Sequence, residues 1–138
     1  HSSGRVVVPA REELGPQRLL FDLRELSGDA TTNEGMSRLP KGEVTSVRFG
    51  KNQSLSIRLA KHDFTLVSGS QFLLIDDSGA DVRIPPGQAV VGRGSNCSVV
   101  LDPRFRSISR KHLMVDIRDD GTALLTDISS MGTYMPSL

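Results

Sequence analysis

The chain is poor in the residues on which several common functions depend. Its 138 residues include no tryptophan, one tyrosine and one cysteine, and aromatic residues make up 4%. The single cysteine, Cys97, excludes an internal disulfide and favours a reducing compartment. We therefore expect an intracellular (cytoplasmic) protein or the soluble part of a larger one. No apolar stretch is long enough to span a membrane, so we expect no direct membrane insertion.

Positive and negative charges are also nearly equal in number. The 17 lysines and arginines face 16 aspartates and glutamates, which gives a formal net charge of +1. This balance and the scarcity of aromatic rings exclude nucleic acid as the expected partner. Any recognition of anions therefore depends on a local cluster of cations.

The first 38 residues differ from the rest of the chain in composition and in hydrophobic pattern. Residues 1–5 resemble the remnant of a purification tag and are left out of the fold prediction. Residues 6–38 predict an N-terminal helix and a flexible linker. Leucines recur along Arg11–Leu26 at a spacing that fits one face of a short helix. Ser27–Arg38 is rich in Gly, Asp, Thr, Asn and Ser, as linkers are.

Residues 39–138 predict one all-β domain, a sandwich of antiparallel strands. Leu55, Ile57 and Leu59 alternate with polar residues and, with Val44–Phe49, predict a hairpin through a turn at residues 50–53. Short strands separated by Gly, Pro and Asp turns are the pattern of a β-sandwich. Six further strands are predicted at residues 72–75, 81–84, 88–91, 99–101, 112–118 and 122–127.

Three clusters in the second half of the chain suit the binding of a phosphate group. They are Gly92-Arg93, Ser109-Arg110-Lys111-His112 and Ser129-Ser130-Met131-Gly132-Thr133. An arginine fork contacts two phosphate oxygens at once, and a serine hydroxyl donates to a third. In this order the clusters resemble the forkhead-associated (FHA) domain, a module that reads phosphothreonine.

The resemblance implies roles for individual residues. Arg93, Ser109, Arg110 and Ser130 would bind the phosphothreonine. Gly92, His112, Gly132 and Thr133 would shape the loops, with His112 acting through hydrogen bonds rather than on the ligand. The remaining basic residues of these loops either contact the bound peptide or are simply solvated. These basic residues are Arg104, Arg106 and Lys111. Met131 is a further candidate for contact with the peptide.

The chain departs from the family at the third cluster. Met131 and Pro136 stand where the family has asparagines, and the first of these asparagines holds the backbone of the bound peptide. Methionine offers neither that donor nor that acceptor, at a cost of about 0.5–1.5 kcal/mol per lost bond. A phosphate-independent assembly or scaffolding domain therefore stands as the alternative function.

The family's final strands are missing after the third cluster, because the sequence ends at Leu138. Residues 39–50 resemble that missing segment. We therefore expect a circularly permuted domain in which residues 39–60 supply the last strands, as neighbouring chain ends allow. The alternative is a truncated or domain-swapped FHA domain with residues 39–67 as an unrelated hairpin, and the oligomeric state stays open.

No enzyme, cofactor or metal is expected. Ser109, His112 and Asp127 invite comparison with a catalytic triad, but Ser109 and His112 lie three residues apart without nucleophile-elbow glycines. No spacing of His, Cys and Asp suggests a metal site. The expected partner is a phosphorylated protein, a kinase substrate, or the chain's own tail phosphorylated at Thr31 or Thr32. An ordinary polar linker is the alternative interpretation of those threonines.

Overall fold

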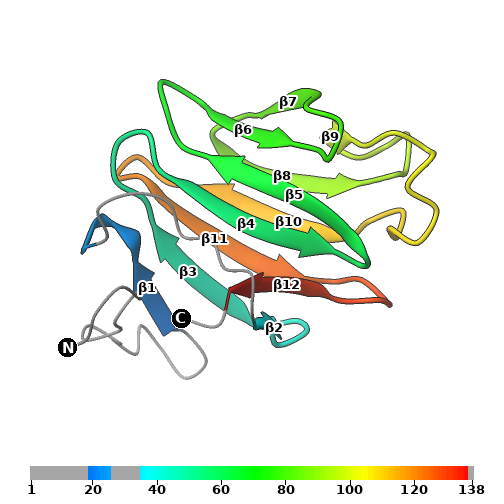
Figure 1. Cartoon of the computed structure of the whole chain (residues 1–138), viewed down its shortest axis with the longest axis horizontal. Helices are drawn as coiled ribbons and strands as arrows, with labels where there is room; N and C mark the ends of the chain where they lie inside the picture. The colour runs from blue at the N-terminus through cyan, green and yellow to red at the C-terminus, as the bar shows by residue number, and fades with distance from the viewer. Residues whose placement is uncertain (1–18, 26–34, 137–138) are drawn as a thin grey trace.

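Side chains alternate between a buried and an exposed face along the strands. In Ser54–Leu59 the three apolar side chains are buried and the polar ones between them are not. The computed structural model describes residues 19–25 and 35–136, and within these two six-stranded sheets pack face to face (Figure 1). The predicted all-β class and sandwich architecture are confirmed.

The described strands are short, as the turn residues predict. Their bounds are β1 Leu19–Asp22, β2 Met36–Arg38, β3 Val44–Arg48, β4 Ser54–Leu59, β5 His62–Val67, β6 Phe72–Ile75, β7 Asp81–Ile84, β8 Gly87–Gly92, β9 Val99–Val100, β10 Leu113–Ile117, β11 Thr122–Asp127 and β12 Thr133–Pro136, with a 3-10 turn η1 at Leu23–Glu25.

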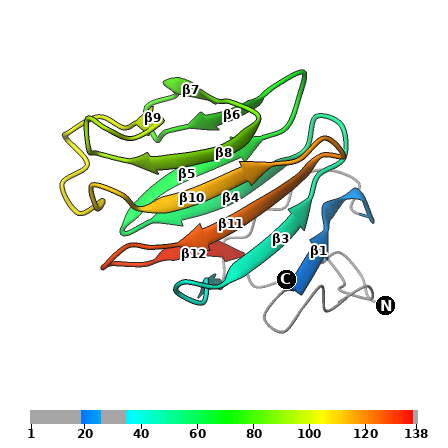
Figure 2. The same ribbon diagram turned by 180° about the vertical axis from the view of Figure 1, so that it is seen from behind.

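Each sheet mixes strands from both halves of the chain. The first sheet has the order β1-β3-β11-β10-β8-β9 and faces the viewer in Figure 2. The second has the order β2-β12-β4-β5-β6-β7 and faces the viewer in Figure 1. Pairing is antiparallel except at two edges of the first sheet, where β1 joins β3 and β9 joins β8 in parallel.

The hairpin predicted between residues 44 and 59 is wrong. β3 and β4 lie in different sheets, and the turn after β3 carries the chain across the sandwich. β3 pairs instead with β11, and β4 pairs with β12. Residues 39–60 therefore complete both sheets against the second half of the chain, as a permuted domain requires. The permutation itself stays a prediction.

The helix predicted over Arg11–Leu26 is wrong at residues 19–22, and Leu23–Glu25 forms only a single 3-10 turn. Residues 19–22 form β1 along the edge of β3, and Leu23 is fully buried in the core with 0% exposure. Its carbonyl oxygen accepts a hydrogen bond of 2.6 Å from the Gln53 amide. A sheet edge with unpaired backbone groups favours strand pairing over a short isolated helix. Residues 11–18 and 26 lie outside the described residues.

Part of the predicted linker is also a strand. Met36–Arg38 forms β2 against β12, with Arg38 opposite Tyr134. Residues 1–5, the predicted tag remnant, and Thr31 and Thr32, the candidate phosphorylation sites, lie outside the described residues. The described segments contain no helix long and apolar enough to cross a membrane.

Burial of Leu23 gives a test of the docked N-terminal strand. We expect Leu23→Ala to lower the free energy of unfolding by about 2–5 kcal/mol, as truncation of a buried leucine does. Val100→Ala is the matched control, because Val100 is 49% exposed and surface changes stay within about 0.5 kcal/mol. Urea unfolding measures both variants, and equal stabilities would show that the segment is not docked in solution.

Candidate functional site

The three sequence clusters meet at one end of the sandwich, on the right in Figure 1. The first follows β8, the second precedes β10, and the third is the turn from β11 to β12. The turn between β4 and β5 lies at the same end. The sheet pairing alone thus assembles loops that are far apart in the sequence.

Gly92 allows two of these loops to touch. A side-chain carbon at this position would lie 2.0 Å from the carbonyl oxygen of Arg110, so any larger residue collides with backbone. The Arg93 amide donates to the carbonyl of Ser109 at 3.2 Å. The carbonyl of Arg110 accepts from the Gly94 amide at 3.0 Å and from the buried thiol of Cys97 at 2.8 Å. This close approach brings Arg93 and Arg110 together.

Three cations surround an open hollow of about 840 Å³ beside these loops. Its walls are Arg93, Arg110 and Lys111 together with residues 94–96. Arg93 is half-buried, and its Nε donates to the carbonyl of Ile108, which fixes the stem and leaves the two terminal nitrogens for a ligand. The arrangement concentrates positive charge where a dianion can approach from solvent.

Ser109 and Ser130 come together at a second point. Their hydroxyl oxygens lie 3.3 Å apart, and the Ser130 amide donates to the Ser109 hydroxyl at 3.2 Å. Neither serine belongs to the walls of the hollow. The structure therefore places the predicted phosphate ligands in two groups, the cations of the hollow and the serine pair. The two groups are adjacent in the chain, because Ser109 of the pair is followed by Arg110 of the hollow.

His112 joins the second cluster to the third. Its ring is fully buried, and Nδ1 accepts from the Ser109 amide at 3.0 Å. The proton must then reside on Nε2, which donates to the carbonyl of Gly132 at 2.8 Å. Burial lowers the pKa of His112, while the Gly132 carbonyl and the charge of Asp127 act in the opposite direction. The neutral ring is the form that these hydrogen bonds require.

Asp127 organises the third cluster, a role that sequence reasoning missed. One carboxylate oxygen of this fully buried residue accepts from the Ser129 hydroxyl at 2.6 Å and from the Thr133 hydroxyl at 2.9 Å. Ser129 in turn accepts from the Gly132 amide at 2.7 Å. Gly132 has φ +99°, which favours glycine. An Asp with a Ser two positions later is a known local hydrogen-bonding pattern that signals such a turn.

The four residues that are candidates for contact with the peptide lie in different environments. Arg104 pairs with Asp77 at 3.0 Å and Asp76 at 3.5 Å, so nearby carboxylates already balance its charge. Its guanidinium also lies 4.1 Å from the ring centre of the buried Phe105. Arg106 is exposed, and Met131 is 55% exposed. Of the uncertain basic residues, Lys111 is the one that lines the hollow.

The geometry does not form a catalytic triad. His112 contacts the backbone amide of Ser109, and the Ser109 hydroxyl contacts Ser130. Asp127 directs its hydrogen-bonded oxygen to Ser129 and Thr133. Among the described residues, no group of three or more His, Cys, Asp or Glu could hold a metal ion.

One comparison with known proteins gives a family. Residues 89–137, which contain all three clusters, match the family model of the FHA domain. The resemblance expected from the motifs is therefore confirmed over these residues. No curated protein and no solved structure matches the chain.

The lowered pKa of His112 predicts a pH dependence of folding. The unfolded histidine takes up a proton near its ordinary pKa of about 6.5, while the folded one stays neutral to lower pH. We expect full stability above that pH and a loss as the pH falls from it toward the folded pKa. Unfolding free energies from pH 8 to 5 should fall for the wild type and change less for His112→Gln, and equal slopes would contradict the assignment.

The tight contact at Gly92 predicts a sharp cost for one added carbon. Gly92→Ala should unfold the protein or displace the loop of Arg110, because the collision is with backbone that cannot rotate away. Gly69→Ala is the control, since its nearest neighbour would lie at an ordinary 3.5 Å. Thermal unfolding of both variants decides the point, and equal melting temperatures would show that the loops do not approach this closely.

Proposed function

We propose that this chain, which carries an FHA domain, binds phosphothreonine-containing protein segments through Arg93, Ser109, Arg110 and Ser130. FHA domains are non-catalytic interaction modules that bind phosphorylated proteins. The observation that carries the proposal is the hollow lined by Arg93, Arg110 and Lys111, together with the serine pair that begins at Ser109, the residue before Arg110. The proposed role is therefore recognition in signalling, without chemistry on the ligand.

The charge of the site fits the charge of the ligand. A phosphothreonine carries about −1.5 to −2 charge near neutral pH and presents three acceptor oxygens. Arg93 offers two terminal nitrogens on a stem already held by the Ile108 carbonyl, so little side-chain entropy is lost on binding. Arg110 and Lys111 are exposed and lack an ion pair within the described residues.

The serine pair supplies neutral donors. Ser109 and Ser130 now satisfy each other across 3.3 Å, and a phosphate oxygen can replace that mutual contact with two stronger charge-assisted bonds. His112 holds the Ser109 amide and the Gly132 carbonyl at fixed positions. The pair is thus arranged before the ligand arrives, which lowers the cost of binding.

The proposal extends to the setting of the domain. The partner is a phosphorylated kinase substrate or the chain's own segment phosphorylated at Thr31 or Thr32. An intracellular location agrees with the free buried thiol of Cys97. The domain is proposed to be circularly permuted over residues 39–138, which the pairings of β3 with β11 and β4 with β12 support.

A second candidate function is a phosphate-independent assembly domain. Met131 favours it, because an exposed side chain with only a weak acceptor stands in the turn of residues 129–133, which we call the recognition turn. A surface of this kind binds apolar partners more readily than a peptide backbone. Titration with paired phosphorylated and unphosphorylated peptides separates the two candidates.

Binding to a degenerate phosphothreonine peptide library tests the proposal. Fluorescence anisotropy should show phosphate-dependent binding that falls about tenfold or more in Arg93→Ala and Arg110→Ala, since a charged hydrogen bond contributes about 1.5–3 kcal/mol. Arg83→Ala, at an exposed position on β7, is the matched loss of charge and should bind like the wild type.

The controls make each outcome informative. Circular dichroism must show that each variant is folded, because Arg93 also holds the Ile108 carbonyl. Arg110→Ala removes a ligand without touching that bond. Equal affinity for phosphorylated and unphosphorylated peptides, in folded wild-type protein, would favour the assembly domain.

A further inference from the structure

A row of polar side chains crosses the exposed face of the second sheet. Strand register places Arg38 of β2 opposite Tyr134 of β12, Tyr134 opposite Arg58 of β4, and Arg58 opposite Asp63 of β5. Directly opposed residues of neighbouring antiparallel strands point to the same face. We call Arg38, Tyr134, Arg58 and the neighbouring Lys61 the cationic row.

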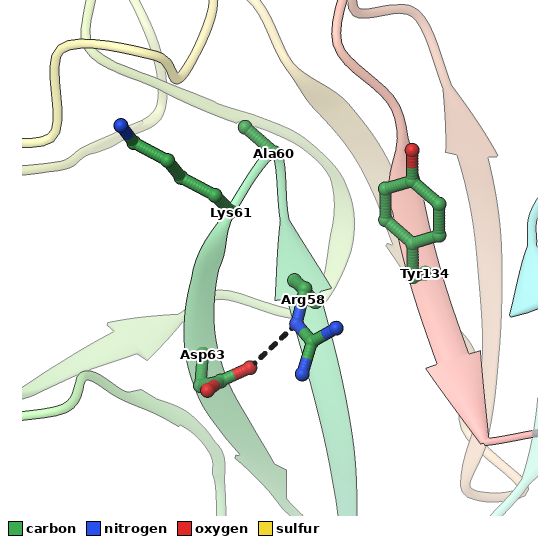
Figure 3. A pocket seen from close by; sticks show the side chains of 5 residues that line it. All are labelled: Arg58, Ala60, Lys61, Asp63 and Tyr134. Carbon is green, nitrogen blue, oxygen red and sulfur yellow. Dashed lines mark hydrogen bonds and ion pairs between the residues drawn. The ribbon is translucent and has the colours of Figure 1, made fainter. Parts of the chain in front are cut away.

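Three members of the row, Arg58, Lys61 and Tyr134, line a hollow of about 330 Å³, and Arg38 lies outside its walls. Figure 3 shows the Tyr134 ring on one side and the Arg58–Asp63 pair on the other, with Lys61 extending from the turn between β4 and β5. Arg58 and Lys61 offer donors from two sides of the hollow, while Asp63 accepts from Arg58. The chemistry of the hollow therefore suits a small anion.

The cationic row is continuous with the recognition turn. The Tyr134 hydroxyl donates to the carbonyl of Met131 at 3.2 Å. A side-chain carbon on Gly132 would lie 2.8 Å from Nε of Arg38 and 2.9 Å from the Tyr134 hydroxyl, so both side chains lie against Gly132. Ser130, a proposed phosphate ligand, is two residues away. A peptide that reaches Ser130 can therefore continue across Met131 onto the row.

The positive charge of the row is only partly balanced. Arg58 pairs with Asp63 at 2.8 Å, but both side chains are exposed, and such pairs are weak and open readily. Arg38 lies 3.9 Å from the second carboxylate oxygen of Asp127, which has no hydrogen-bond partner. Lys61 is exposed and has no ion pair in the described part of the chain. Three cations thus face two carboxylates.

We propose that the cationic row binds an acidic side chain of the segment whose phosphate is held at Arg93. This inference rests on the proposed function and deepens it, because it assigns a class of partner: phosphothreonine segments that carry a nearby aspartate or glutamate. Arg58 and Lys61 bind the carboxylate at the hollow, and Arg38, which the strand register places on the other side of Tyr134, adds positive charge beside it. Asp63 competes for Arg58 and so limits the affinity.

Paired peptide libraries provide the test. Each library has a fixed phosphothreonine and carries glutamate or glutamine at one flanking position at a time. Wild-type protein should prefer glutamate at one or two positions. That preference should fall about two- to fivefold in Arg38→Gln and in Arg58→Gln, the range of an exposed ion pair. Asp63→Asn should raise it, because it frees Arg58.

Arg83→Gln is the control for the loss of one positive charge. It removes an exposed arginine from β7, at the opposite edge of the same sheet, and should leave the glutamate preference unchanged. An equal loss in Arg83→Gln would reduce the effect to net charge and overturn the inference. An unchanged preference in both Arg38→Gln and Arg58→Gln would also overturn it.

The outcome separates this inference from the proposed function. Phosphate-dependent binding without any glutamate preference refutes the cationic row and leaves the reader function standing. Absence of phosphate dependence refutes the reader function itself. Circular dichroism of each variant shows whether the sheet is intact, and Asp63→Asn keeps the test decisive if an arginine variant fails to fold.

Discussion

The end of the sandwich where the three clusters meet depends on one neutral imidazole. His112 uses one ring nitrogen as an acceptor from the Ser109 amide and the other as a donor to the Gly132 carbonyl. A protonated ring would present a second donor to the Ser109 amide, which is itself a donor. The protein therefore needs the ring buried and uncharged, and burial supplies both conditions at once. With the Ser109–Ser130 contacts and the pairing of β10 with β11, these two hydrogen bonds hold the loops before β10 and after β11 together.

The matched residues do not form a sandwich by themselves. Residues 89–137 contribute most of the first sheet but only β12 to the second. β12 pairs with β4 on one side and with β2 on the other, and β5 extends the sheet beyond β4. The core needs both sheets, because each buries one apolar face against the other. Segments before residue 89 therefore complete the two sheets, and with Arg38 and Arg58 they also form the surface beside the turn of residues 129–133.

The sequence was informative where turn chemistry is strong. Runs between Asp, Gly and Pro turns gave β6, β7 and β11 with their observed bounds. The sequence does not predict β5, because the turn that leads to it from β4 consists of Ala60 and Lys61, which are not typical turn residues. Ala60 has a positive φ of 60°, a conformation that is unusual for alanine. The helix prediction failed because a leucine spacing is ambiguous over so few residues, and the free edge of β3 decides the outcome.

Residue type and order in the sequence are enough to select the candidate site residues. They do not predict which of these residues come into contact in the folded protein. Nothing in the spacing says that Ser109 meets Ser130 or that Arg104 is occupied by Asp76 and Asp77. These contacts join residues 21 or more positions apart, and only the sheet pairings set them. Asp127 holds the third cluster through the hydroxyls of Ser129 and Thr133, its near neighbours in the sequence, and so serves a turn rather than a catalytic triad.

The scarcity of aromatic residues gives the protein a built-in optical label. With no tryptophan and one tyrosine, ultraviolet emission above the phenylalanine background comes from a single phenol ring. That ring is Tyr134, whose hydroxyl touches the Met131 carbonyl at the recognition turn. Its quantum yield is sensitive to hydrogen bonding and to neighbouring charges. Changes of occupancy at this end of the molecule can therefore be followed in unlabelled protein, without a dye that would disturb the surface being studied.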